Sequence, residues 1–369
     1  MNRYSVDLTL ELLSPCFLGG AFQQPEFRIA SLRGIWRYWY RALYGRGDED
    51  RPWEDERRIF GGVGVEDDGN RRQPSAATGR GSARLVLRES SRGLNGSEWS
   101  PSRPPSGADY LLFSMGMNKR QGLNEGQTVL LRLLLAKDGE EADRAVRSFL
   151  AACAFSGLGA RSRHMAGAVS LGTAGPVGPI AWIRAGTPDA LAGRLRELIQ
   201  PSLGRRVGQP RYHIVASGAF RAGVLQRVFR TWREALDTIG SALRSFRLRR
   251  EPDYSIAKGV AHGQRLAQGQ TITRAAFGLP IQFRFRSLGG SGFGVEMEAS
   301  DRRGSPLFLT LERLADPLSP IAVVWCLFRS PLTPDGSIRI GQSSAPAPDL
   351  SIIDEMLRRP EFASHAVAE

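Results

Sequence analysis

The first half of the chain predicts an α+β fold of the ferredoxin-like kind, in which an antiparallel sheet carries its helices on one face. Three observations support this class: a strand of strictly alternating polarity at residues 4–12, an amphipathic helix at 31–43, and a strand and helix at 129–135 and 140–155. The resulting order, strand, helix, strands, helix, strand, is that of a split β-α-β unit.

The strand at residues 4–12 has apolar side chains at even positions and polar ones at odd positions, which indicates one buried and one wet face. Residues 14–20 interrupt this pattern, and Ser31 is the expected N-cap of the helix that follows. The stripe of that helix with the spacing of a buried face consists of Leu32, Ile35, Trp36, Trp39, Tyr40 and Leu43.

Shorter patterns predict the rest of the first half. Residues 64–83 and 90–107 are rich in Gly, Pro, Ser and Arg, and we interpret them as mobile insertions into the domain. Smaller predicted elements are a helical turn at 54–59 and strands at 85–87, 110–113 and 129–135. The helix at 140–155 should end at Gly157, because glycine commonly ends helices.

The second half begins after a predicted linker at residues 175–179, so we expect one domain at 1–178 and another at 179–369. Its predicted elements are helices at 188–200 and 226–246 and strands at 280–287, 293–299, 306–312 and 321–329. The glycine-rich residues 289–294 lack the Gly-Lys-Ser/Thr ending of a phosphate-binding loop, so we interpret them as a hairpin turn. No internal repeat can be aligned between the halves.

The charge balance favours a polyanionic partner. The 369 residues contain 50 Lys+Arg against 37 Asp+Glu, a net charge of +13. Only three of the basic residues are lysines, at 119, 137 and 258. Arginine offers a planar fork that suits phosphate. Because a GC-rich genome also produces arginine excess, composition alone favours nucleic acid only weakly.

Cysteine and histidine usage argues against a metal site and against disulfides. Cys16, Cys153 and Cys326 form no CxxC pair, and the four histidines lack ligand spacing. We therefore expect no metal and no cofactor, and we interpret the acidic residues between 48 and 56 as a solvated or subunit-facing surface. The N-terminus has no apolar signal core, and the longest apolar run, 321–328, is too short for a bilayer. These features predict a soluble cytoplasmic protein.

The predicted helix at 31–43 carries Arg33, Arg37 and Arg41 in one row, four residues apart. No Asp or Glu occurs between residues 28 and 47, so the row has no counter-charge nearby in sequence and is expected to face an external anion. Tyr38 lies next to the row and is a candidate for stacking on a base. The alternative is a solvated amphipathic helix without a ligand.

A second basic segment follows the last predicted helix of the first half. Gly157 and Gly159 allow close approach of the backbone, and Arg161, Arg163 and His164 add side-chain donors. We expect this loop to cradle a phosphate; the alternative is an ordinary helix C-cap and a solvated loop. His164 is also the candidate acid-base group if the protein cleaves RNA.

Six segments carry a recognisable pattern in order along the chain, and they are Pro15–Gly20, Phe27–Leu43, Glu56–Gly61, Gly157–Arg163, Ala276–Ile281 and Arg303–Leu309. They resemble the RAMP superfamily of CRISPR-associated proteins, and more narrowly the family of first subunits of type III-B Cmr effector complexes. The glycine- and arginine-rich segment resembles that family's central loop, although His164 stands where a further arginine is expected.

The resemblance implies two tandem ferredoxin-like (RRM-type) domains in a non-catalytic subunit near the 3′ end of the guide RNA. It implies guide (CRISPR) RNA and target RNA as partners in antiviral defence, together with other Cmr subunits, especially the sixth subunit and the backbone subunit. Carried over position by position, the RNA-contacting arginines are Arg33, Arg37, Arg41, Arg161 and Arg163.

Two other functions stay open on the sequence. A RAMP-type endoribonuclease that processes guide precursors without a metal would use His164 as its acid-base group. A protein that binds anionic membranes or acidic proteins would need a basic surface with an exposed apolar face, whereas the aromatic face of the arginine helix is predicted to be buried in a core.

Overall fold

The computed structural model describes most of the chain. The residues it leaves undescribed are 1–2, 21–23, 46–52, 68–71, 80, 89–92, 137–138, 173–175, 178–179, 183, 208–209, 211, 249, 286–288, 290–291, 299–301, 316–317 and 334. The predicted linker at 175–179 lies in large part outside the described residues.

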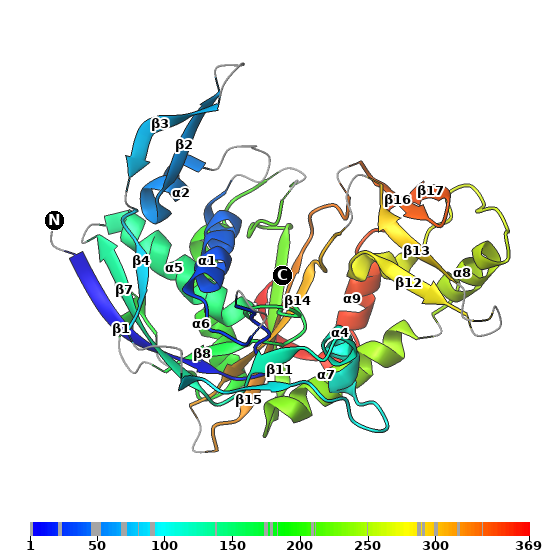
Figure 1. The fold of residues 1–369 in the computed structure, drawn as a ribbon, viewed down its shortest axis with the longest axis horizontal. Coiled ribbons are helices and arrows are strands. Elements are labelled where there is room, and N and C mark those ends of the chain that lie inside the picture. Colours follow the sequence, from blue (N-terminus) through cyan, green and yellow to red (C-terminus); the bar gives the residue numbers. More distant parts are fainter. Residues whose placement is uncertain are drawn as a thin grey trace.

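The first half folds around an antiparallel sheet with the strand order β4-β7-β1-β8 (Figure 1). Its strands and the two helices that pack on it are β1 (Arg3–Leu12), α1 (Ile29–Tyr44), β4 (Arg84–Leu87), β7 (Thr128–Ala136), α5 (Gly139–Phe155) and β8 (Val169–Leu171). The first strand lies between the third and fourth of this unit, which is the arrangement of a split β-α-β fold. The predicted class of the first half is confirmed.

The second half repeats this topology, with the strand order β14-β15-β11-β18. Its elements are β11 (Phe220–Phe229), α7 (Trp232–Arg247), β14 (Leu307–Arg313), β15 (Ile321–Phe328), α9 (Ser351–Leu357) and β18 (Ser364–Ala368). The ferredoxin-like topology thus occurs twice, although no repeat can be aligned in the sequence. The domain boundary at 178/179 stays a prediction.

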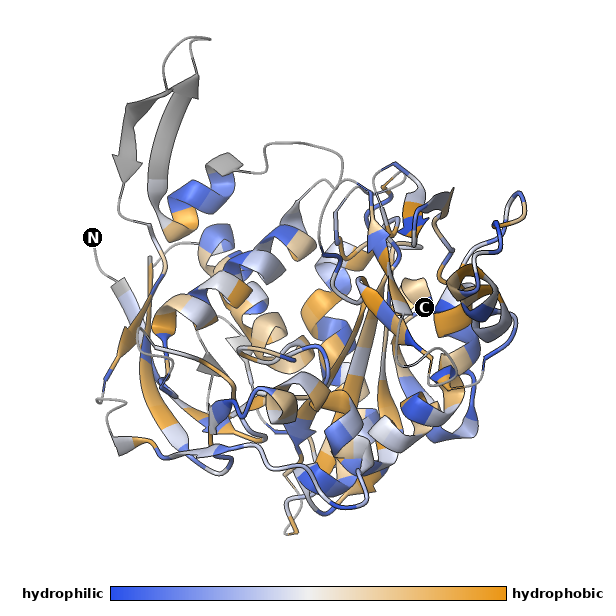
Figure 2. Ribbon diagram, turned by 45° about the vertical axis from the view of Figure 1, so that its right-hand side comes forward, coloured by the Kyte–Doolittle hydropathy of each residue, from blue (hydrophilic) through white to orange (hydrophobic). Residues whose placement is uncertain are grey.

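One hydrophobic core fills the space between the two sheets. It contains α1, α5 and α6 (Pro188–Leu203) and joins Trp39 of α1 to Phe220 of β11 and Phe328 of β15. The other face of the second sheet packs against α7 and α9, so every residue of β15 is buried. Figure 2 shows these central strands as hydrophobic ribbons beneath more polar helices and loops. In β1, polar residues alternate with buried ones because helices cover only one face of its sheet.

A third sheet, with the order β12-β13-β16-β17, forms a separate lobe at the right of Figure 1. This lobe has its own core and consists of α8 (Asp253–Ala261), η2 (Thr273–Phe277), β12 (Ile281–Arg284), β13 (Gly292–Met297), β16 (Ser337–Ile340) and β17 (Ser343–Pro346). The strands predicted at 280–287 and 293–299 exist, but they belong to this lobe. They pair as an antiparallel hairpin, whose turn lies largely outside the described residues.

Several local predictions are wrong. The strand predicted at 110–113 is replaced by two short helices, α3 (Gly107–Leu111) and α4 (Phe113–Met117), since Ser106 and Asp109 form a capping box that starts α3. The residues at 226–229 end β11, so the predicted second helix begins only at Trp232. α1 begins at Ile29, ahead of the predicted cap Ser31.

The stretches interpreted as insertions contain regular structure. Residues of the first stretch form a hairpin of β2 (Gly62–Asp67) and β3 (Arg72–Gly79) beyond α2 (Trp53–Phe60). The remaining elements are β5 (Gly96–Glu98), β6 (Gln121–Leu123), β9 (Pro176–Val177), β10 (Ile180–Ala181) and η4 (Pro360–Phe362). Within the described part of the chain, none of the helices combines the length and apolarity that crossing a bilayer requires.

Candidate nucleic-acid interface

The arginine row on α1 has a buried counter-charge. Glu56 of α2 is fully buried, and its Oε1 lies 2.5 Å from Arg37 Nε and 3.0 Å from Arg41 Nη1. The prediction that the row lacks a counter-charge is therefore wrong, because α2 packs back against α1 and brings a carboxylate from beyond residue 47. The interpretation of Glu56 as part of a solvated surface is wrong for the same reason. Arg37 and Arg41 thus share the carboxylate of Glu56.

Arg33, the third member of the row, donates to the main-chain oxygen of Phe60 at the end of α2. The row therefore also holds α2 onto α1. A sequence signal for this existed, because Glu56 and Phe60 are four residues apart and so lie on one face of a helix.

Tyr38 lies at the junction of the two halves. Its hydroxyl is 2.5 Å from His213 Nδ1, and its ring stacks on Phe308 with centroids 6.0 Å apart and planes at 26°. Burial raises the pKa of the phenol. The ring face that Phe308 covers is not available to a base, because the second sheet packs against this part of α1, an arrangement that local sequence patterns cannot predict.

The glycines of the loop at 157–168 serve close packing of the loop on itself. A Cβ at Gly157 would lie 2.2 Å from the Ala166 oxygen, and one at Gly159 would lie 2.5 Å from the Phe17 oxygen. Several loop N–H groups that were expected to face a phosphate bond to main-chain oxygens instead, as the Leu158 N–H does to Gly167 and the Ala160 N–H does to Phe17. These N–H groups are not available to an anion.

Arg161 and Arg163 reach from this loop toward neighbouring elements. Arg163 Nη1 donates to the Ser305 oxygen at 2.5 Å, and its guanidinium lies 4.4 Å from the centroid of the Phe308 ring. Arg161 Nε donates to Ser114 Oγ at 3.0 Å. Neither arginine has a carboxylate partner among the residues that the structure describes. Burial lowers the pKa of both guanidinium groups, which indicates that their charge is poorly compensated.

His164 carries no charge near neutral pH. Burial, together with the positive charges of Arg161, Arg247 and Arg163, lowers its pKa to about 3. Its main chain forms a bridge with Leu309 of β14. A general acid works best with a pKa near the operating pH, so this environment gives the endoribonuclease alternative no support.

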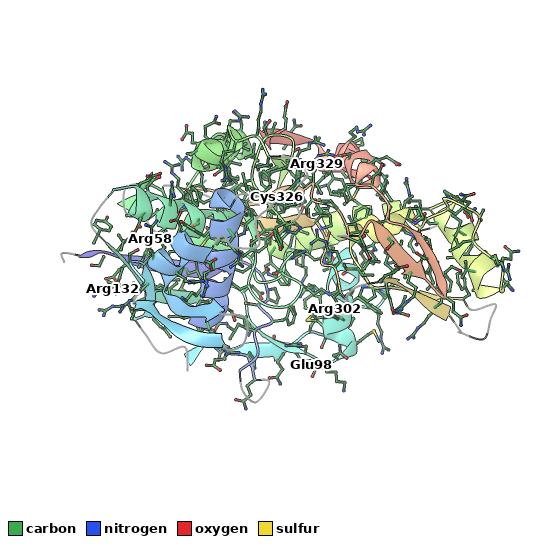
Figure 3. The ribbon with its side chains drawn as sticks, turned by 90° about the horizontal axis from the view of Figure 1, so that it is seen from above. Arg58, Glu98, Arg132, Arg302, Cys326 and Arg329 are labelled. Carbon is green, nitrogen blue, oxygen red and sulfur yellow. The ribbon has the colours of Figure 1, made fainter. Side chains whose placement is uncertain are left out.

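Three arginines of the second half, which sequence reasoning missed as site residues, approach the loop. Burial lowers the pKa of Arg161, and the charges of Arg247 and Arg302 lower it further. Burial also lowers the pKa of Arg303, and the charge of Arg163 adds to this shift. Figure 3 labels Arg302 between the helices of the first half and the third-sheet lobe. The available signal was that Arg303 begins one of the segments that carry the family resemblance.

The two predicted arginine groups approach a common point. The charges of Arg163, Arg303 and Arg41 all act on the Tyr38 phenol, each favouring its ionised form against burial. Arg41 of the α1 row and Arg163 of the loop are therefore both close enough to Tyr38 to act on it. Elsewhere in the described structure, no group of three or more His, Cys, Asp or Glu side chains could hold a metal ion.

Comparison with known proteins supports the predicted resemblance. Residues 9–170 match the family model of the RAMP superfamily. The chain is similar to Cmr1 from Pyrococcus furiosus (apo form), with a TM-score of 0.63, 14% identity and 99% of both chains covered. It is also similar to a chain of the Type III-B Cmr-beta complex bound to cognate target RNA and AMPPnP, with a TM-score of 0.52, 11% identity, and 96% of this chain and 98% of that chain covered. At such identities the likeness shows a common fold. No match was found among curated proteins.

Proposed function

From the match of residues 9–170 to the family model of the RAMP superfamily, we propose that this chain is a non-catalytic RNA-binding subunit of a type III-B CRISPR effector complex. Its partners are guide and target RNA near the 3′ end of the guide, the sixth subunit and the backbone subunit. The similar chain of the Cmr-beta complex comes from an assembly bound to cognate target RNA, which supports the choice of RNA as the ligand.

The observation that carries the proposal is the pair Arg161 and Arg163, which has no carboxylate partner among the described residues. Guanidinium groups that no acid compensates attract phosphate, and such contacts position RNA without reading its sequence. Guide pairing then supplies the specificity. The arginine row of α1 extends the basic surface along which a backbone can lie.

The salt dependence of binding to single-stranded RNA tests this proposal. The logarithm of the affinity falls with log[salt] by about 0.7 per phosphate contacted. Removing both charges in Arg161→Gln/Arg163→Gln should flatten the slope by about 1.4. Because Glu56 already compensates part of the row, Arg33→Gln/Arg37→Gln/Arg41→Gln should flatten it by about 0.7–1.4, below the value of about 2 for three free charges.

The matched control is Arg339→Gln, which removes one arginine charge in the third-sheet lobe, where Arg339 pairs with Glu296. This variant should keep the wild-type slope. Slopes that stay unchanged in both multiple variants, with native circular dichroism, would contradict the proposal. Membership of the complex is tested separately by purifying the tagged chain from its host and identifying the bound RNA and proteins.

A further inference from the structure

Arg163 lies against the chain directly after Arg303. Its Nη1 donates to the Ser305 oxygen, and its guanidinium is so close to Gly304 that a Cβ there would come within 2.3 Å of Nη1. The Phe308 ring supports the other side of the guanidinium, 4.4 Å from the ring centroid. Arg163 of the first half is thus fixed against Gly304 and Ser305, the two residues that follow Arg303 in the second half.

Two oxygens fix one end of the Arg303 guanidinium, while another of its N–H donors is unused. Its Nη2 donates to Ser330 Oγ at 3.0 Å and to the Pro331 oxygen at 3.3 Å. Its Nε is buried and has no hydrogen-bond partner in the described part of the chain. A buried donor without a partner costs about 1–3 kcal/mol, so native structures rarely keep one without a reason.

His213 supplies a second unused group at the same place. Its ring stacks on Phe328 with centroids 4.5 Å apart, and its Nδ1 lies 2.5 Å from the Tyr38 hydroxyl. When Tyr38 donates to Nδ1, the neutral imidazole carries its proton on Nε2, which is buried without a partner. Burial lowers the pKa of His213, and the charges of Arg303 and Arg163 lower it further.

Among the residues that the structure describes, no carboxylate balances this group. Arg163 and Arg303 bond only to carbonyl and hydroxyl oxygens in the described structure. Each guanidinium is partly buried, and the charge of Arg163 lowers the pKa of Arg303. Hydrogen bonds to neutral oxygens orient the two groups but do not remove the repulsion between them, whereas one tetrahedral anion between them would.

We infer that Arg163 and Arg303 form a subsite for a single phosphate group at the junction of the two halves, which the RNA backbone fills. The inference rests on the proposed function and adds to it a residue from the second half. Free inorganic phosphate offers the same chemistry as a phosphodiester, so it serves as a probe that does not depend on RNA.

Thermal unfolding of the full chain with added inorganic phosphate, against chloride at equal ionic strength, tests the subsite. Wild type and Arg339→Gln should show a phosphate-specific rise of the midpoint. Arg303→Gln should lose this rise, and its midpoint without phosphate should equal or exceed that of wild type, because a repelling charge has gone. Arg163→Gln should behave alike, which guards against a folding defect specific to one variant.

RNA binding provides the second measurement. Arg303→Gln should flatten the salt slope by about 0.7, and Arg303→Lys, which keeps the charge but loses the fork, should keep most of the slope while weakening binding. A full phosphate-specific rise in Arg303→Gln, or its absence in wild type, would overturn the subsite. RNA binding with a wild-type slope in Arg303→Gln would overturn it too, while leaving the proposed function intact. Failure of the wild-type chain to bind RNA would instead refute the proposed function.

Discussion

Glu56 Oε1 lies 2.5 Å from Arg37 Nε, and the carboxylate that provides it is fully buried. The same oxygen also binds Arg41, so one acidic side chain of α2 holds two arginines of α1. Its Oε2 has no hydrogen-bond partner among the described residues. The α1 row is therefore as much a link between two helices as a charged surface.

Glu56→Gln should lower the free energy of unfolding by about 1–3 kcal/mol. Removing one partner of a buried pair costs several kcal/mol, and the partial exposure of the arginines reduces that cost. Urea unfolding measures the change. The control is Asp55→Asn on the same helix, whose carboxylate is half exposed, and it should cost under about 0.5 kcal/mol. Equal stability of the two variants would refute this role of Glu56.

Glu312→Gln should stabilise the protein at pH 8 by about 1–3 kcal/mol and much less at pH 5. Burial raises the pKa of Glu312 to about 7, although the hydrogen bonds donated by the Ser170 hydroxyl and the Arg313 N–H act to lower it. A raised pKa gives stability that is complete below the unfolded value of 4.5 and is lost as the pH rises through 7. Midpoints at the two pH values measure it, and a pH-independent difference from wild type would contradict it.

His164→Asn should reduce the loss of stability on acidification. The folded pKa of about 3 lies below the unfolded value of 6.5, so the neutral histidine contributes stability that is present above pH 6.5 and is lost as the pH falls toward 3. Wild type should therefore lose up to about 1.4 kcal/mol per pH unit more than the variant between pH 6 and pH 4. Urea unfolding across this range measures both slopes, and identical slopes would disprove the assignment.

Trp39→Ala should lower the free energy of unfolding by about 3–5 kcal/mol. Trp39 is fully buried, stacks on Phe155 with centroids 5.2 Å apart, and lies in the core that both sheets share. Circular dichroism and tryptophan fluorescence should report one common transition. The control is Trp232→Ala on α7, where the side chain is only partly buried. A first transition confined to one half would contradict the shared core.

Much of the first half was predictable because its signals are local. The alternation at residues 4–12, the stripe on α1 and the helix ending before Gly157 each need only a few neighbouring residues, and each is confirmed. The unpredicted assignment of strands to sheets has a non-local cause. The third-sheet lobe takes its strands from two separate segments that interrupt the second ferredoxin-like unit, so the sequence order of strands does not reveal which sheet each joins.

The sequence predicted that arginines form the candidate site, but it did not predict which of their charges a carboxylate compensates. A window around α1 contains no acid, yet Glu56 reaches it through the packing of α2. The influence of Arg163 on Arg303 depends on how the two sheets face each other. Tertiary structure determines contacts of this kind, and the spacing of residues in a single sequence does not reveal them.

The core between the sheets has a practical consequence for dissecting this molecule. Trp39, Phe155, Phe220 and Phe328 belong to one continuous cluster, so neither ferredoxin-like unit has a complete interior of its own. A protease cut between β8 and β11 should yield two bands on a denaturing gel that still co-elute as one species in gel filtration. Either fragment expressed alone should aggregate, and coexpression of both should rescue its solubility.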